Sequence, residues 1–306
     1  MNEELGFLSR TELLGMKLMK LYHERGFRRY RMDRFEEYDL YVRNKDFLAT
    51  DSVLTFTDTN GRLMALKPDV TLSLLKSVSP SDGSVSRLYY SESVYRASGG
   101  DGGFREIPQT GVEFIGSITP GIQRELVTLA CESLALCSAD YALSLSHTSL
   151  TSSFIDRLGI SPGEREELVG YISRKSFHEC RRLLGASGAD SEDAERLIAL
   201  ASVSGRAEDV LPKIESLCVT DEDRKEAEEL RFVSEGLGNV FIDFSEIADT
   251  SYYNGIIMRG FVYGSPGRVL SGGRYDPLLK RMGRLGGAIG FAVYMDSIGN
   301  STVREK

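Results

Sequence analysis

The sequence predicts an α+β fold in which helices flank a large antiparallel sheet and a helical block interrupts the chain. Strand patterns occur on both sides of that block, mostly as neighbouring hairpin strands and not as β–α–β units, which favours an antiparallel sheet. Residues 152–235 form the block, because they are charged, cut by Gly and Pro, and without strand alternation. We therefore expect a core domain made of 1–151 and 236–306, with 152–235 as an all-helical insertion.

The elements expected in the core follow from hydrophobic periodicity and turn signals. Apolar residues at helical spacing predict the first helix, which Ser9 or Thr11 can cap and Gly26 can end. Alternation around Asn60-Gly61 predicts a hairpin, and Asp69 can cap the helix that follows it. In chain order, we expect a helix at 8–26, a strand at 27–33, a hairpin at 52–68, a helix at 69–78, strands at 85–97 and 104–117, a helix at 121–137, strands at 141–149, 239–245, 253–264 and 268–275, and a closing helix, strand and helix before 298.

Composition and charge restrict the classes of function. The 306 residues carry a net charge of −8 with a pI near 5.2, which argues against a constitutive nucleic-acid binder. No apolar run is long enough to span a membrane, and the acidic start MNEELGFLSR is not a signal-peptide pattern. Four cysteines without metal-like spacing predict reduced thiols in a cytoplasmic protein, and three scattered histidines predict no metal site.

The most specific signal lies in three separated stretches. They are TDTNGRLMALKPDVT at 57–71, LYYSESVYRASGGDGGFREIPQTGVEFIG at 88–116, and a last group of SYYNGIIMRGFVYG, LSGGRYDPLLKRMG and GGAIGFAVYMDSI. In order and spacing they resemble the class II aminoacyl-tRNA synthetase fold and, within it, histidyl-tRNA synthetase. The resemblance runs over about residues 8–152 and 236–300.

This resemblance implies a site for free L-histidine. Alternation places Gln109 and Glu113, four residues apart, on one face of their strand. By resemblance, Arg96 faces the ligand's carboxylate, while an amide and a carboxylate hold an ammonium or an imidazole N–H. The implied histidine-binding residues are Asp69, Thr71, Arg96, Gln109, Glu113, Tyr252 and Tyr253.

Each of these residues also has an ordinary structural explanation. Asp69 can serve only as a helix cap, and Thr71 can be a plain first-turn residue. Arg96 can pair with a surface acid, and Gln109 and Glu113 can line a solvated strand face. The adjacent tyrosines can be core or sheet-edge aromatics. Because all seven residues occur in the order and spacing of the family's motifs, purely structural roles for all of them are less easily accepted than for any single one.

Departures from the synthetase pattern cluster on the nucleotide side. Ser98 stands where the family has an acid after the arginine, and the loop SGGDGG contains no base. Ala248 replaces the arginine of the family's RGLDYY run, and Ser297 replaces the arginine that ends its last motif. Tyr294 replaces a glycine that lets adenine approach. Adenylation needs cations that bind the ATP phosphates, and these are the residues that this chain lacks. We therefore expect no aminoacylation and no catalytic residue. We also expect no cofactor.

With these losses the chain is similar to the regulatory subunits of ATP phosphoribosyltransferase. That family lacks aminoacylation and an anticodon-binding domain, and none is expected here. The resemblance implies a short-form catalytic subunit as partner, for the first step of histidine biosynthesis, and L-histidine as the inhibitory effector. It also implies a homodimer within a hetero-oligomer, with no tRNA and no membrane as partners. Two alternatives stay open: a stand-alone histidine sensor or adaptor, and a truncated synthetase-like amino-acid ligase.

Overall fold

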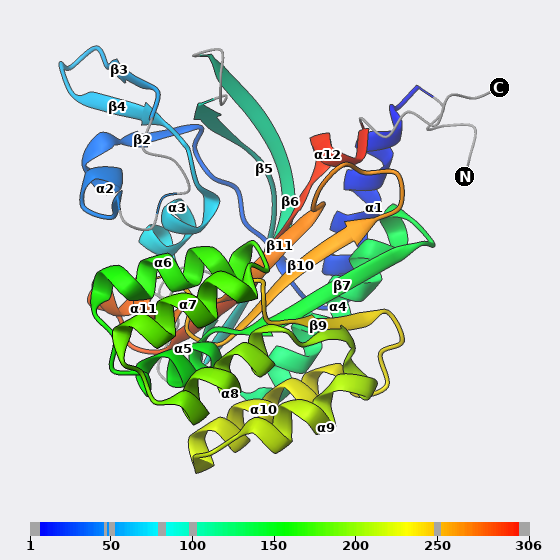
Figure 1. Cartoon of the computed structure of the whole chain (residues 1–306). Coiled ribbons are helices and arrows are strands. Elements are labelled where there is room, and N and C mark those ends of the chain that lie inside the picture. Colours follow the sequence, from blue (N-terminus) through cyan, green and yellow to red (C-terminus); the bar gives the residue numbers. More distant parts are fainter. Residues whose placement is uncertain are drawn as a thin grey trace.

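The computed structural model describes residues 7–45, 48, 53–78, 84–97, 103–247 and 252–299, and a nine-stranded sheet forms its centre (Figure 1). The strands are β1 (Arg28–Arg29), β5 (Val85–Ala97), β6 (Phe104–Gly116), β7 (Tyr141–His147), β8 (Ser204–Arg206), β9 (Val240–Asp243), β10 (Ile256–Val262), β11 (Leu270–Arg274) and β12 (Gly287–Tyr294). Their spatial order is β1-β5-β6-β12-β11-β10-β7-β9-β8. Neighbours run antiparallel except β1 with β5 and β7 with β9, so the predicted antiparallel centre is confirmed and the sheet as a whole is mixed.

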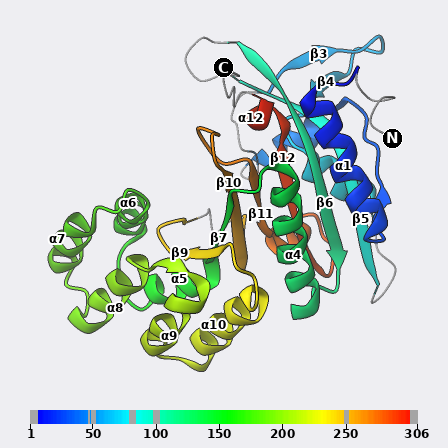
Figure 2. The same ribbon diagram turned by 90° about the vertical axis from the view of Figure 1, so that its right-hand side faces the viewer.

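Two helices, α1 (Arg10–Glu24) and α4 (Pro120–Cys137), cover one face of this sheet (Figure 2). Ser9 caps α1, because its Oγ accepts the backbone N–H of Glu12 while the Glu12 carboxylate accepts the N–H of Ser9. The buried side of α1 repeats at helical spacing through Leu14, Leu18 and Tyr22. These residues join the larger hydrophobic core, which the sheet shares with both helices.

The opposite face carries smaller elements near β5 and β6. A second sheet has the order β2-β4-β3 and stands apart from the large one. These elements are β2 (Phe35–Glu37), α2 (Tyr38–Val42), β3 (Thr55–Thr57), β4 (Leu63–Leu66), α3 (Val70–Ser77) and α11 (Asp276–Arg281), and α12 (Met295–Gly299) closes the described chain. Alternation along β5 gives each face its own core, since Tyr89 joins the first cluster and Leu88 and Tyr90 join the second.

The block at 152–235 is helical with one exception. Its helices are α5 (Thr148–Asp156), α6 (Pro162–Ser173), α7 (Phe177–Ser187), α8 (Ser191–Ala201), α9 (Ala207–Leu217) and α10 (Asp221–Ser234). The prediction of an all-helical block is wrong at β8, which pairs antiparallel with β9 at the sheet edge. Three residues with a central glycine are too short to produce a strand pattern in sequence. Helix α5 also crosses the expected boundary at 151/152, and the first core continues into the block.

Two other predictions can be compared with the observed strands. The hairpin at 52–68 is confirmed, with Gly61 at a φ of +80° in the turn. The strand at 27–33 is reduced to β1, because it pairs only with the edge of β5 before the chain leaves towards β2. Within the described ranges, no helix combines the length and apolar character that a membrane crossing requires.

Candidate functional site

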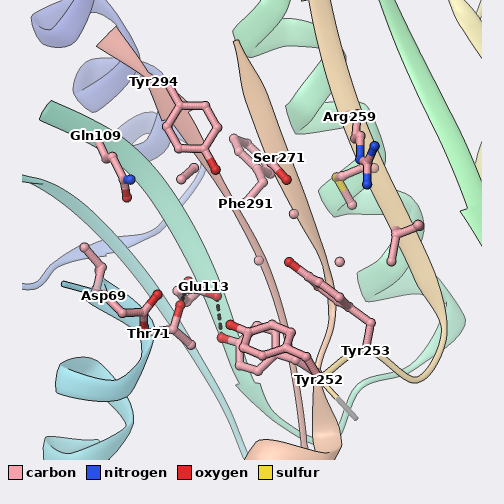
Figure 3. Close-up of a pocket in the computed structure, with 18 of the residues that line it drawn as sticks. Asp69, Thr71, Gln109, Glu113, Tyr252, Tyr253, Arg259, Ser271, Phe291 and Tyr294 are labelled. Atoms are coloured by element: carbon pink, nitrogen blue, oxygen red, sulfur yellow. Dashed lines mark hydrogen bonds between the residues drawn. The ribbon is translucent and has the colours of Figure 1, made fainter. Parts of the chain in front are cut away.

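A cleft with a volume of about 410 Å³ lies on the face of the large sheet opposite α1 and α4. Its walls come from β6, β12, β11 and β10, the start of α3 and the segment before β10 (Figure 3). A hollow of this size is in the range of small-molecule sites. All seven residues of the predicted histidine site line it: Asp69, Thr71, Arg96, Gln109, Glu113, Tyr252 and Tyr253.

The floor of the cleft consists of small residues on adjacent strands. Glu113 of β6 is in register with Gly290 of β12, which is in register with Gly273 of β11. A Cβ atom on Gly290 would lie 1.8 Å from Oε2 of Glu113, which is far inside van der Waals contact. Only glycine at this position leaves the glutamate room to stand over the sheet, so the sequence of β12 itself shapes the site.

Glu113 is the most deeply buried acid of the cleft, with 3% of its surface exposed. The hydroxyl of Tyr275 donates to its Oε2 at 2.5 Å, and the hydroxyl of Thr71 donates to its Oε1 at 3.4 Å. Burial raises the pKa of Glu113 to about 8, against the hydrogen bond from Tyr275, and the nearby charge of Asp69 raises it further. A carboxylate that has only neutral donors favours a cationic ligand group beside it.

Asp69 caps a helix and also lines the cleft. Its Oδ1 accepts the backbone N–H of Leu72 at 2.9 Å and so caps α3. Its Oδ2 lies 4.0 Å from Nη2 of Arg96, whose Nε donates to the carbonyl of Pro68 at 3.0 Å. Burial raises the pKa of Asp69, and the Arg96 charge opposes that rise. Arg96 therefore pairs with a cleft acid and not with a surface acid.

Three tyrosines form an aromatic wall on one side of the cleft. The ring centroids of Tyr252 and Tyr253 are 4.5 Å apart at an interplanar angle of 60°, and those of Tyr252 and Tyr275 are 5.8 Å apart. Burial raises the pKa of Tyr252 well above its ordinary value, so its phenol stays neutral. A wall of rings with hydroxyl tips suits a planar group that also carries N–H donors or acceptors.

The cleft wall also contains Tyr275, Arg259 and Arg268, which sequence reasoning did not assign to the site. Tyr275 lies in the Arg-Tyr-Asp run after the Gly-Gly pair, where it reaches Glu113. Arg259 is the charged residue of the otherwise apolar strand IIMRGFV, which was a usable signal because arginine is uncommon among buried apolar residues. Arg268 precedes β11, in a stretch where no sequence pattern distinguishes it.

Of the four positions expected to show the loss of a nucleotide site, Tyr294 is the one found in the cleft wall among the residues that the structure describes. Tyr294 lines the cleft beside Gln109, its cross-strand partner (Figure 3). Ser297 lies in α12 and is not part of the cleft wall; its N–H donates to Oδ1 of Asp296 at 2.8 Å. Ser98 and Ala248 lie outside the described residues.

Known proteins provide a further comparison. The family described as histidyl-tRNA synthetase matches residues 7–298. A protein from Alkaliphilus metalliredigens, named ATP phosphoribosyltransferase regulatory subunit, is 27% identical over 297 residues, which cover 94% of this chain and 75% of that protein.

Solved structures have the same fold. One from Bacillus halodurans, described as an ATP phosphoribosyltransferase regulatory subunit/histidyl-tRNA synthetase, has a TM-score of 0.81 at 23% identity, over 95% of this chain and 78% of that chain. A chain of the ATP phosphoribosyl transferase (HisG:HisZ) complex from Thermotoga maritima has a TM-score of 0.72 at 18% identity, over 94% of this chain and 98% of its own.

Proposed function

Because the chain belongs to the histidyl-tRNA synthetase family, we propose that it is the regulatory subunit of an ATP phosphoribosyltransferase, which starts histidine biosynthesis. The observation that supports this proposal is the cleft, whose wall contains all seven residues predicted for the amino-acid site and also Tyr294, where the family has a glycine. Relatives with the proposed name, such as the one from Alkaliphilus metalliredigens, support it over 94% of the chain.

The proposed partner is the short-form catalytic subunit, in a hetero-oligomer that contains a homodimer of this chain. The Thermotoga maritima complex, whose chain has the same fold, supports an assembly of this kind. The four cysteines are free and buried, which agrees with the reducing cytoplasm as the proposed location.

The proposed effector is free L-histidine, bound in the cleft. Its ammonium group has two acceptors there, the carboxylates of Asp69 and Glu113, and its imidazole faces the tyrosine wall around Tyr252. Gln109, which is 4% exposed, offers both an acceptor and a donor at the cleft edge. Histidine can change activity only if it binds two states of the complex with different affinity, so we propose that cleft occupancy favours a less active arrangement.

We also propose that the chain does not activate histidine with ATP. Adenylation requires cations around the α-phosphate, and this chain has the uncharged residues Ala248 and Ser297 at two positions where the family has arginines. A histidine-dependent exchange of pyrophosphate into ATP by the purified chain would contradict this and favour the amino-acid ligase.

The test of the function is a reconstitution. The chain is mixed with the short-form catalytic subunit of the same organism, and phosphoribosyl-ATP formation is followed with and without millimolar L-histidine. We expect the mixture to be more active than either protein alone, and histidine to lower its rate. A catalytic rate that is the same with and without this chain would instead leave a stand-alone sensor or adaptor.

A further inference from the structure

We infer that the cleft has a second, basic end formed by Arg259 and Arg268, and that this end binds the carboxylate of the same amino acid whose ammonium group lies at Glu113 and Asp69. This inference rests on the proposed function, because it assumes that the cleft holds an amino acid. It assigns the carboxylate to residues on the β10 side of the sheet and not to Arg96.

The register of the strands places the two ends on opposite sides of one floor. Glu113 stands on β6, while Arg259 is in register with Ser271 of β11, which is in register with Ala292 of β12. Three strand spacings separate β6 from β10, which is roughly 14 Å between the two backbones. The floor between them is glycine, alanine and serine, and Figure 3 shows Glu113 and Arg259 on its two sides.

The two arginines have a mutual repulsion that an anion would relieve. Burial and the neighbouring charge of Arg268 lower the pKa of Arg259. Arg259 forms an ion pair with Glu246, and the side chains are 27% and 24% exposed, respectively. A guanidinium has five donors, so this pair holds Arg259 in place and leaves donors for a ligand. Arg268 makes no hydrogen bond or ion pair with any residue in the part of the chain that the structure describes.

Arg96 is less available for the carboxylate. Its Nε already donates to the carbonyl of Pro68, and its Nη2 faces Asp69. A carboxylate placed there would also lie close to that acid and be repelled by it. At the other end, Arg259 also has an acid beside it, Glu246, but Arg268 has no acid partner among the residues that the structure describes, and Ser271 adds a hydroxyl donor next to Arg259. The arrangement therefore suits a zwitterion, with its cationic groups towards β6 and its carboxylate towards β10.

The experiment compares L-histidine with histamine, which has the ammonium and imidazole groups but no carboxylate. Binding of both is measured by calorimetry to the full chain and to the variants Arg259→Gln and Arg268→Gln. Arg43→Gln is the matched control, because Arg43 is 78% exposed on the side chain and lies outside the cleft. Arg268→Gln removes an exposed side chain, so it tests the inference even if Arg259→Gln does not fold.

We expect wild type to bind histidine roughly tenfold or more tightly than histamine, the scale of one hydrogen bond between charged groups. Each cleft variant should remove most of this preference by weakening histidine while histamine binds as before or better; Arg43→Gln should keep it. Equal loss for both ligands, or no loss in Arg268→Gln, would overturn the inference. Inorganic phosphate binding beside saturating histidine, and lost in the same variants, would assign the basic end to a separate anion. If wild type binds neither ligand, the proposed histidine site itself fails.

Discussion

The hydroxyl of Tyr275 donates a hydrogen bond of 2.5 Å to Oε2 of Glu113, across 162 positions of sequence. The bond joins β6 to the segment that enters α11. It is shorter than the second hydroxyl contact of this buried carboxyl, which comes from Thr71. Burial raises the pKa of Glu113 to about 8, and the hydrogen bonds from the neutral Tyr275 and Thr71 hydroxyls offset this rise only in part. Burial therefore gives the cleft an acid whose charge depends on pH.

Glu113→Gln should change how stability depends on pH. Folding raises the pKa of Glu113 from 4.5 to about 8, so the folded state binds this proton more tightly than the unfolded state. The resulting contribution to stability is complete below pH 4.5 and is lost as the pH rises towards 8. Wild type without ligand should lose up to about 1.4 kcal/mol per pH unit relative to the variant over this window. Thermal melts of both proteins from pH 5 to 8.5 measure the difference; parallel curves would mean that Glu113 titrates normally.

Tyr275→Phe removes one donor from the same carboxyl. An unsatisfied buried acceptor costs about 1–3 kcal/mol, and the cost should be larger above pH 8, where Glu113 is ionised, than at pH 5. Chemical denaturation of the variant at the two pH values is the measurement. A loss of equal size at both would indicate a packing effect of the ring and not the hydrogen bond.

Gly290→Ala should displace Glu113, because the added Cβ would lie 1.8 Å from its Oε2. We expect overpacking to cost about 1–3 kcal/mol of stability and histidine affinity to fall at least tenfold. Gly267→Ala is the control, since its Cβ would have no atom within 4 Å. Calorimetry that finds wild-type affinity in Gly290→Ala would place the ligand away from Glu113.

Substitutions of Asp69 can separate helix capping from the proposed binding of the ammonium group. Asp69→Asn keeps a side-chain oxygen for the N–H of Leu72, whereas Asp69→Ala loses the cap at about 1 kcal/mol. If the carboxylate also binds the ammonium group, both variants should lose histidine affinity, but only the alanine variant should lose stability. Unchanged histidine binding in Asp69→Asn would reduce Asp69 to a helix cap.

Two residues of the cleft could be placed from strand alternation, which is a local rule, and the other five predicted site residues came from the family resemblance. The spacing of Gln109 and Glu113 on one strand was enough to place them on one face. Tyr275 and Arg259 could not be assigned this way, since their roles depend on which strands become neighbours in the sheet. The register that brings Tyr275 to Glu113 and Arg259 to the other end of the cleft joins segments far apart in the chain.

The same limit explains the differences in the fold. Helix α1 was predicted with Ser9 or Thr11 as its cap, and Ser9 is the cap, because its contacts with Glu12 are contained within one turn. Strand β8 was not, because three residues become a strand only when β9 lies beside them. The parallel pairing of β7 with β9 also depends on the helical block that separates them in sequence.

The most direct test of the account is the histidine dose response of the assembled complex. Phosphoribosyl-ATP formation by the short-form catalytic subunit is measured with wild type and with Glu113→Gln, each relative to the same complex without histidine. The account predicts that wild-type complex is inhibited and that the variant complex needs at least about tenfold more histidine for the same fractional inhibition. Identical dose responses in the two complexes would contradict it, because histidine would then act at a site other than this cleft.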